Sequence, residues 1–429
     1  MVIHVVQPGE TISSIAQYYN IPVSRLILEN GIVNPDNLAI GQTIVVVQPE
    51  TLYTIQPGDT LESIAEQHGV SPMELLRNNP YLSEREVLYV GETIVISYQT
   101  NRVRTIATSG YIFSYIDKSI LMKTLPFLTY LTLFNYRITT EGDLITLGND
   151  TELIQLAKAY GVAPMMFVSA ISEEGIVSRE VTYQILNNSS VQEHLINNTL
   201  QMLKAKGFYG INVYVENMTY DNIDAFAEFL KKASETYRSE GYRIVITITP
   251  VTNIDTPNVS FEKLDYTKLA DYVDGIIFSS YDWARTYSYP SSIFPVNILR
   301  EWLDYAVSII PSEKIFLGVT TLGYDWTLPY VPGATQAVAV NFNSAVQIAA
   351  ENHIPIQYNE AAQSPYFYYV DSDEVMHVVW FKDARSFDSR AKLVAEYGLQ
   401  GLSLWTTMRF DTQMWLIIHI QYYIEKVYL

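Results

Sequence analysis

The chain has 429 residues, which is too long for one ordinary domain of roughly 100 to 200 residues, so two or three domains are expected. Hydrophobic residues make up 48% of the sequence, enough for a sizeable core, and this excludes wholesale disorder. The net charge of −19 argues against a nucleic-acid partner or an anionic membrane surface, because phosphate groups must be met by clustered lysines and arginines.

The sequence contains no cysteine, which excludes disulfides and thiolate chemistry. The start MVIHVVQPGE lacks a positive region followed by an apolar one, so no secretory signal is expected. The longest apolar stretches, such as MWLIIHI near the C-terminus, fall well short of the ~18 residues that suggest a membrane span. We therefore expect a protein that is made without export and has no membrane partner.

An internal repeat opens the chain. The stretch QPGETISSIAQYYNIPVSRLILENG begins at Gln7, and QPGDTLESIAEQHGVSPMELLRNNP begins at Gln56. Each unit reads as a short apolar strand, a Pro-Gly turn, two helices and a strand that begins at a glycine, Gly41 or Gly91. The sequence therefore predicts two βααβ units, at residues 1–49 and 50–98.

The first helix of the second unit follows a capping signal. Asp59 followed by Glu62 indicates a capping box at its start.

Both units resemble the LysM module. The matching residues are Gly9-Glu-Thr-Ile, Gly58-Asp-Thr-Leu, Ile15-Ala16, Ile64-Ala65, Asn30, Asn79, Gly41 and Gly91. The resemblance implies binding of the N-acetylglucosamine-containing glycans of peptidoglycan and chitin.

Charge in this region favours a neutral ligand. The first 100 residues hold eleven acidic residues against three arginines, a net charge of −8. Binding is therefore expected to come from shape, backbone hydrogen bonds and apolar contact. The alternative reading is that the repeats form only a structural cap.

Beyond the polar connector at residues 98–104, strand-like runs alternate with amphipathic helices such as Ser190–Leu203. This alternation predicts a (β/α)₈ barrel over residues 104–429. A long connection from Leu322 to about Lys392 predicts an α+β insertion, at about residues 323–392, on one lip of the barrel. The predicted strands are Ile106–Phe113, Leu128–Phe134, Ala163–Val168, Gly210–Val215, Arg243–Ile248, Gly275–Phe278, Lys314–Val319 and Gly401–Trp405.

Reactive groups in such barrels lie at the carboxyl ends of the strands. Carboxylates, tyrosines and tryptophans gather at these positions, a composition typical of sugar sites, because aromatic rings stack on pyranose rings while carboxylates bind hydroxyls. The candidate residues are Glu216 after the fourth strand, Tyr281, Asp282 and Trp283 after the sixth, Tyr324, Asp325 and Trp326 after the seventh, and Trp405 at the eighth.

The order of these segments resembles glycoside hydrolase family 18, and in particular its bacterial spore-cortex members with two N-terminal LysM modules. The resemblance rests on Leu128-Thr-Tyr-Leu131 with Phe134, Tyr281-Asp282-Trp283, Gly323-Tyr-Asp-Trp-Thr-Leu-Pro-Tyr330, His377-Val-Val-Trp380-Phe-Lys-Asp383-Ala-Arg385-Ser, and Gly401-Leu-Ser-Leu-Trp405. It implies substrate-assisted retention, in which the 2-acetamido oxygen of the substrate attacks the anomeric carbon in place of an enzyme nucleophile.

The resemblance also implies roles for single residues. Glu216 matches the general acid/base, Tyr281 and Asp282 match groups that contact the acetamido group, and Trp405 matches the floor beneath the sugar. The family pattern Asp-x-Glu is broken here, because Tyr214 stands where the aspartate is expected.

Strand alternation predicts that Asn212 and Tyr214 point into the barrel together with Glu216, and both are candidate substrate-binding residues. A phenol is neutral at pH 7, so it offers no negative charge to an oxazolinium ion. By analogy with the removal of an oxyanion-hole donor, this substitution would lower the rate on the order of 10² to 10³-fold.

Two hypotheses remain open. The first is a glycosidase of the N-acetylglucosaminidase type, held on peptidoglycan by its LysM pair. The second is a catalytically weak or inactive glycan-binding or spore-coat protein. Scattered histidines predict no metal site, and the absence of nucleotide-binding motifs predicts no cofactor. We expect a monomer, and the resemblance implies a place in the spore coat or cortex.

Overall fold

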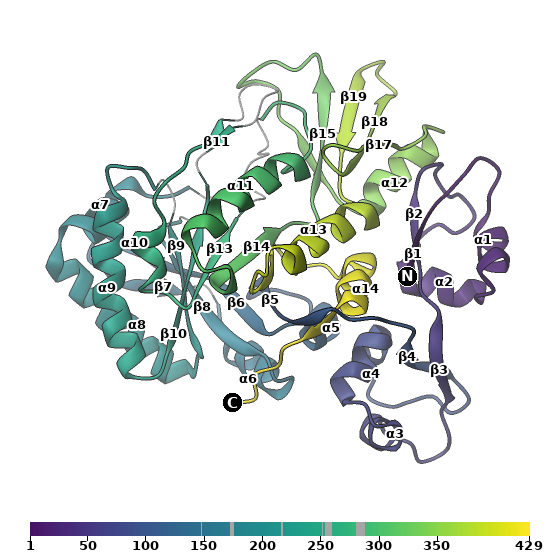
Figure 1. The fold of residues 1–429 in the computed structure, drawn as a ribbon, viewed down its shortest axis with the longest axis horizontal. Helices are drawn as coiled ribbons and strands as arrows, with labels where there is room; N and C mark the ends of the chain where they lie inside the picture. The colour runs from purple at the N-terminus through teal and green to yellow at the C-terminus, as the bar shows by residue number, and fades with distance from the viewer. Residues whose placement is uncertain (147, 172–175, 216–217, 251, 254–259, 280–287) are drawn as a thin grey trace.

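The computed structural model describes residues 1–146, 148–171, 176–215, 218–250, 252–253, 260–279 and 288–429. The chain forms two small units, a barrel, and a sheet inserted near the end of the barrel (Figure 1). Among these residues, no helix is long and apolar enough to cross a membrane.

The first small unit places two helices against a two-stranded antiparallel sheet. Ile15, Leu26 and Ile44 are buried between them. Thr11 caps the first helix: its hydroxyl accepts from the backbone N–H of Ser14, which in turn bonds back to Thr11. The elements are β1 (Val2–Val5), α1 (Ile12–Tyr19), α2 (Val23–Asn30) and β2 (Thr43–Val46).

The second unit repeats this arrangement with a core around Ile64, Leu75 and Ile94. Its first helix has a capping box formed by Thr60 and Ser63, one residue beyond the predicted Asp59 and Glu62. The elements are β3 (Pro49–Thr54), α3 (Leu61–His68), α4 (Pro72–Asn78), the 3₁₀ turn η1 (Pro80–Glu84) and β4 (Thr93–Tyr98).

The prediction of the cap was wrong because the Asp59 carboxylate has other partners. It accepts from the Gln56 backbone N–H at 2.7 Å and from the Tyr53 hydroxyl at 2.9 Å. Asp59 therefore closes the Pro-Gly turn before the helix rather than capping the helix itself.

A buried asparagine fastens helix to strand in both units. Asn30 donates to the carbonyls of Leu26 and Val45 and accepts from the Val45 N–H at 2.6 Å. Asn79 makes the same three bonds, to Leu75 and Val95. A carboxamide both donates and accepts, so one side chain satisfies the end of a helix and the middle of a strand.

Eight parallel strands close into the barrel by the pairing of β5 with β6, which confirms the predicted (β/α)₈ fold. The strands are β5 (Arg104–Phe113), β6 (Tyr130–Ile138), β8 (Ala163–Ser169), β9 (Gly210–Val215), β10 (Arg243–Ile248), β13 (Gly275–Phe278), β14 (Ile315–Val319) and β20 (Gly401–Leu404). Two short strands extend this sheet: β7 (Leu144–Thr146) runs antiparallel to β6, and β21 (Tyr422–Ile424) runs parallel to β5.

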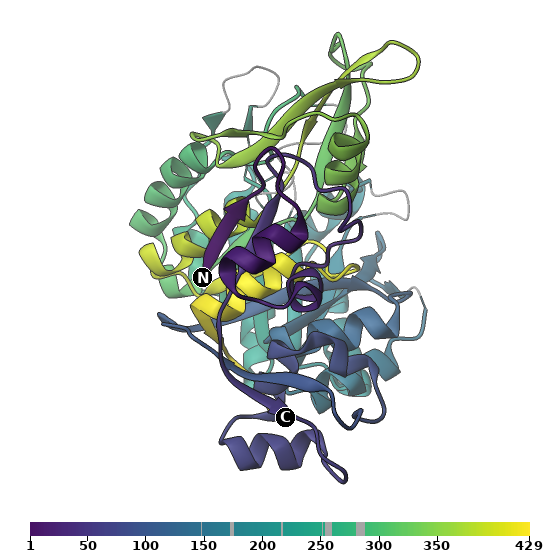
Figure 2. The ribbon, with the colours of Figure 1, turned by 90° about the vertical axis from the view of Figure 1, so that its right-hand side faces the viewer.

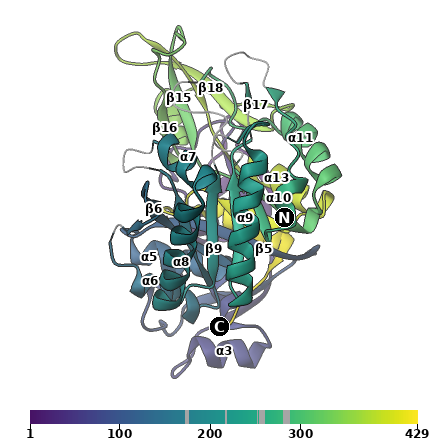
Figure 3. The ribbon, with the colours of Figure 1, turned by 90° about the vertical axis from the view of Figure 1, so that its left-hand side faces the viewer.

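Amphipathic helices cover the outside of the barrel. Figure 3 shows α8 and α9 side by side over the strands. The helices are α5 (Lys118–Thr124), α6 (Thr151–Ala159), α7 (Arg179–Asn187), α8 (Ser189–Lys206), α9 (Ile223–Ser239), α10 (Thr267–Ala270), α11 (Val296–Ile309), α13 (Ala384–Glu396) and α14 (Thr412–Gln421). The shorter pieces are η2 (Leu125–Phe127), η4 (Ser312–Lys314) and the hairpin of β11 (Thr252–Asn253) with β12 (Ser260–Phe261).

The insertion between β14 and α13 is a five-stranded antiparallel sheet with one helix, and it stands above the barrel in Figure 1. Phe367, Val379 and Phe381 form its core against the helix. Its elements are β15 (Gly323–Leu328), β16 (Val338–Val340), α12 (Phe342–Glu351), β17 (Gln357–Asn359), β18 (Ser364–Val370) and β19 (Met376–Trp380).

The first unit is packed on the barrel and on the insertion, as Figures 1 and 2 show. Gln413 of α14 donates to the Asn30 side chain at 3.1 Å and to the Thr43 carbonyl at 2.8 Å. The Ile356 N–H, in the insertion, donates to the Ile40 carbonyl at 2.9 Å. These contacts fix the first unit in place beside α14.

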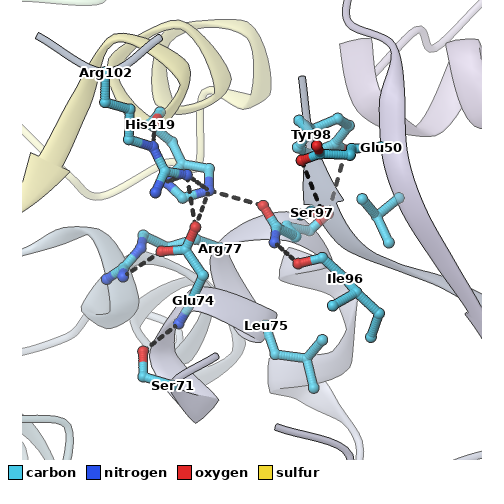
Figure 4. Close-up of polar contacts among 12 residues, drawn as sticks. Glu50, Ser71, Glu74, Leu75, Arg77, Ile96, Ser97, Tyr98, Arg102 and His419 are labelled. Atoms are coloured by element: carbon cyan, nitrogen blue, oxygen red, sulfur yellow. Dashed lines mark hydrogen bonds and ion pairs between the residues drawn. The ribbon is translucent and has the colours of Figure 1, made fainter. Parts of the chain in front are cut away.

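The second unit meets the barrel through a buried charged cluster, drawn in Figure 4. Glu74 pairs with Arg77 at 2.9 Å and with Arg102 at 2.6 Å. His419 of α14 lies 2.8 Å from the Asn78 side chain, and Arg102 donates to the His419 carbonyl. Burial holds the pKa of His419 well below its usual value. The second unit is therefore joined to α14 by polar bonds shielded from water.

Candidate active site

Strand β9 divides its side chains between two environments. Ile211, Val213 and Val215 belong to the large core between the barrel and its helices, whereas Tyr214 packs with the side chains inside the barrel. Asn212 is buried, and its side chain bonds across the barrel interior to Tyr111 and Thr247. The predicted alternation, with Asn212 and Tyr214 facing inward, is confirmed.

Asn212 belongs to a closed ring of hydrogen bonds. Thr247 of β10 donates to the Asn212 carbonyl at 2.8 Å, and the Asn212 amide donates to the Tyr111 hydroxyl at 3.1 Å. The hydroxyls of Tyr111 and Thr247 lie 2.6 Å apart. Because Thr247 gives its single proton to Asn212, Tyr111 donates to Thr247. The ring holds three strands, β5, β9 and β10, at one depth.

Tyr214 belongs to a second chain of hydroxyls nearer the strand ends. Its phenol oxygen lies 3.1 Å from Thr249 Oγ1, and Thr249 lies 2.8 Å from Ser279 Oγ. Ser279 also donates to the Ile248 carbonyl at 3.3 Å, and in each of the two hydroxyl pairs either oxygen can be the donor.

Trp405 directly follows the eighth strand and lies beside a set of aromatic rings. Its ring centroid lies 5.4 Å from Tyr111, 5.4 Å from Phe134 and 6.1 Å from Phe113, all in edge-on or tilted geometry. The Trp405 side chain is partly exposed at the mouth of the barrel. This is the position expected of a platform for a sugar ring.

Four of the predicted site residues lie outside the described part of the chain: Glu216, Tyr281, Asp282 and Trp283. Their roles remain predictions. The described residues nearest to them in sequence are Val215, which ends β9, and Ser279, which directly follows β13, at the same mouth of the barrel as Trp405.

The three predicted residues of the insertion have different surroundings, all on β15. Trp326 is 0% exposed and donates from Nε1 to the Ser288 carbonyl at 3.0 Å, which leaves no face for a sugar. Asp325 accepts from the Tyr369 hydroxyl at 2.7 Å and lies 2.9 Å from His377 Nδ1. Tyr324 is partly exposed and packs against Trp326. The placement of Trp326 argues against its predicted contact with substrate.

Sequence reasoning missed four hydroxyl residues that support the mouth: Tyr111, Thr247, Thr249 and Ser279. Their inward positions follow from strand alternation once the register of β9 with β10 is known, Tyr214 opposite Thr247. That register was the missing signal. Among the described residues, no group of three or more His, Asp or Glu side chains could hold a metal ion.

Comparison with known families gives two matches. A model described as glycosyl hydrolases family 18 matches residues 168–409, and a LysM domain model matches residues 4–47 and 53–97. The cortical fragment-lytic enzyme of Bacillus subtilis (strain 168) is 31% identical over 432 residues, covering 99% of this chain and 99% of that protein. The Bacillus anthracis enzyme of the same name is 31% identical over 424 residues, covering 98% of each.

Solved structures agree. The spore cortex-lytic enzyme SleL of Bacillus megaterium QM B1551 is similar with a TM-score of 0.80 at 32% identity, covering 99% of this chain and 98% of that one. A chitinase from Chromobacterium violaceum ATCC 12472 has a TM-score of 0.65 at 23% identity, covering 73% of this chain and 98% of that one, and this likeness concerns the fold alone. The resemblance predicted from the repeats and the strand-end motifs is confirmed.

Proposed function

Because the chain belongs to the glycosyl hydrolases of family 18 and carries two LysM domains, we propose that it cleaves glycosidic bonds next to N-acetylglucosamine in spore-cortex peptidoglycan fragments. The two full-length relatives are named for action on cortical fragments, which supports this substrate. The same names support a place in the spore cortex or coat. A monomer fits a site that is built from one barrel.

Catalysis in this proposal uses the acetamido group of the substrate as the nucleophile. Glu216 gives its proton to the leaving oxygen as the acetamido oxygen bonds to the anomeric carbon. Glu216 then takes a proton from the water that opens the oxazolinium ion. Tyr281 and Asp282 hold the acetamido group, and Trp405 supports the sugar ring from below.

The observation that carries the proposal is the bonding of Tyr214. Its phenol oxygen lies 3.1 Å from Thr249 Oγ1, in a chain of hydroxyls that continues to Ser279. A phenol hydroxyl both donates and accepts hydrogen bonds, so it suits contact with the acetamido group, whose orientation decides whether the acetamido oxygen reaches the anomeric carbon. A neutral phenol thus retains the positioning part of the missing aspartate's role, while its electrostatic part is lost.

That loss favours the second candidate, a glycan-binding coat protein with little or no turnover. Without a negative charge, the oxazolinium ion has less stabilisation, on the order of 3 to 4 kcal/mol by analogy with an oxyanion-hole donor. Product release from cortex fragments by the full chain, compared with Glu216→Gln, separates the two candidates. Equal background release by both proteins, with binding retained, would leave only the second candidate.

A further inference from the structure

Segment 288–296 leads from the predicted site residues after the sixth barrel strand into helix α11. In the sequence it follows the stretch that carries Tyr281, Asp282 and Trp283, and α11 begins at its last residue, Val296. The segment belongs to the barrel, yet side chains of the insertion and of α13 bond to it near both of its ends. It is therefore held from outside its own strand and helix.

Trp326 of β15 holds the start of the segment. Its indole Nε1 donates to the Ser288 carbonyl at 3.0 Å, and its ring is fully buried. An indole has a single N–H donor, so this one bond uses the whole hydrogen-bonding capacity of the side chain. Trp326 thus supports the backbone of the segment rather than a sugar ring.

Two buried cationic side chains hold the far end of the segment. Lys382 Nζ donates to the Ile293 carbonyl at 2.5 Å, and Arg390, on α13, donates to the Phe294 carbonyl at 2.7 Å. Phe294 has a φ of 50°, in the left-handed region that residues other than glycine seldom adopt. Such a conformation persists only where its surroundings enforce it, and donors on two consecutive carbonyls do so.

Neither cation is buried together with a carboxylate partner. Asp383, next to Lys382 in the sequence, pairs instead with Arg385 at 2.7 Å, and among the described residues no carboxylate forms an ion pair with Lys382 or Arg390. Burial and the charge of Arg390 hold the pKa of Lys382 well below its usual value. Apolar side chains of similar volume would cost less to bury, so the two donors indicate that the position of these carbonyls matters.

The insertion also bonds directly to the segment. Ser292 Oγ lies 2.6 Å from Ser364 Oγ of β18, and the Val296 N–H donates to the Ala362 carbonyl at 3.2 Å. The side chains that hold its carbonyls from β15 and from the start of α13 are called the brace: Trp326, Lys382 and Arg390.

We propose that the three brace residues are positioning residues for catalysis, which act by fixing segment 288–296 and, through it, Tyr281 and Asp282 against the acetamido group. This inference rests on the proposed function. A displacement of about 1 Å at a group that orients the reacting atoms can lower the rate about 10²-fold. Because Trp405 and the LysM domains are expected to supply glycan binding, loss of the brace should lower kcat and leave KM unchanged.

The test measures kcat and KM for spore-cortex fragments in the full chain with one brace residue changed at a time. Lys382→Met, Arg390→Met and Trp326→Phe each keep an apolar side chain in place and remove the donor to the segment. Arg390→Lys keeps a donor and is the conservative variant. All assays are run well below the melting temperature of the least stable variant.

The chain offers a matched control for two of these changes. Lys426 also donates to two backbone carbonyls, those of Leu125 and Leu128, at 2.7 and 2.8 Å, but these precede β6 at the opposite end of the barrel. Lys426→Met therefore controls for the lysine variant. Trp415, on α14, is 1% exposed, and its Nε1 has no hydrogen-bond partner among the described residues, so Trp415→Phe controls for the tryptophan variant.

In each brace variant kcat should fall at least tenfold while KM stays within twofold of the wild-type value, and Arg390→Lys should lose less than Arg390→Met. Both controls should keep kcat within twofold. Wild-type kcat in the brace variants, or an equal loss in the controls, would overturn the proposal. Should Lys382→Met fail to fold, Trp326→Phe decides by the same criteria.

Amide hydrogen exchange separates a failed brace from a failed function. The amides of segment 288–296, among them the Val296 N–H, should exchange at least tenfold faster in Lys382→Met than in Lys426→Met. Equal exchange would overturn the brace whatever the activity. If the wild type releases no more product than Glu216→Gln, the proposed function fails and the catalytic role of the brace fails with it, while faster exchange would leave the brace as a structural contact only.

Discussion

The phenol oxygen of Tyr214 lies 3.1 Å from Oγ1 of Thr249, the residue that directly follows β10. The side chain that replaces the expected aspartate is therefore bonded to the neighbouring strand's end at the mouth of the barrel. This bond fixes where the phenol oxygen can meet a substrate. It also means that the neutral side chain occupies a defined position rather than filling space at random.

Replacing Tyr214 separates the positioning role from the charge. Tyr214→Phe removes the hydroxyl, so kcat should fall by about tenfold, in line with the loss of one hydrogen bond of about 1 to 1.5 kcal/mol. Tyr214→Asp adds a negative charge beside the oxazolinium ion, so kcat should rise by 10² or more. Steady-state hydrolysis of cortex fragments measures both effects.

Thr249→Val serves as the control for Tyr214. It leaves the phenol in place but removes its hydrogen-bond partner, so a smaller loss than in Tyr214→Phe is expected. Unchanged kcat in Tyr214→Phe, together with no gain in Tyr214→Asp, would argue against any contact of this position with the acetamido group.

Trp405 should contribute to substrate binding, whereas Trp326 should not. Trp405→Ala removes a partly exposed ring at the end of the eighth strand, and KM should rise about tenfold. Trp326→Phe changes a fully buried ring, so the melting temperature should fall while KM stays the same. A rise in KM in Trp326→Phe, with no change in KM in Trp405→Ala, would instead place the sugar platform on β15.

Glu74 should hold the second LysM domain on the barrel. Burial alone would raise the pKa of its carboxyl, but the facing charges of His419 when protonated, Arg77 and Arg102 bring it down to about 2. The folded pKa lies below the ordinary 4.5, so the stabilisation is complete above pH 4.5 and is lost as the pH falls toward 2.

Glu74→Gln leaves two buried guanidinium groups without their carboxylate, so the free energy of unfolding at pH 7 should fall by about 3 to 5 kcal/mol. The exposed Glu86→Gln provides the control and should change it by less than about 0.5 kcal/mol. Urea denaturation measures both. A loss no larger in Glu74→Gln than in the control would contradict the buried cluster's role.

Glu29 should make the stability fall as the pH rises. Its folded pKa of about 7 lies above the ordinary 4.5, so the folded protein holds this proton more tightly and loses about 3 kcal/mol of stability between pH 4.5 and 7. Glu29→Gln has no proton to lose. The difference in unfolding free energy between variant and wild type should therefore grow across this window, and parallel pH curves would contradict it.

The barrel was predictable because each of its strands has a short apolar run with a clear end. Residues Gly210–Val215, for example, form β9 with the predicted bounds. The repeat was equally plain, since Asn30 and Asn79 fulfil the same structural role in both units.

Contacts between distant segments could not be predicted. Buried Trp326 donates to the Ser288 carbonyl 38 positions away. Asp59 accepts from Tyr53, while the cap itself is formed by Thr60. The docking of His419 against Asn78 joins residues 341 positions apart. Such pairings follow from the packing of whole elements, which local sequence does not encode.

The central claim is that this member of family 18 turns over its substrate although Tyr214 stands in place of the aspartate. The most direct measurement is the release of reducing ends from spore-cortex fragments by the full chain and by Glu216→Gln. The account predicts release by the wild type that is at least 10² times that of the variant, at equal glycan binding. Identical background release by both proteins would contradict it.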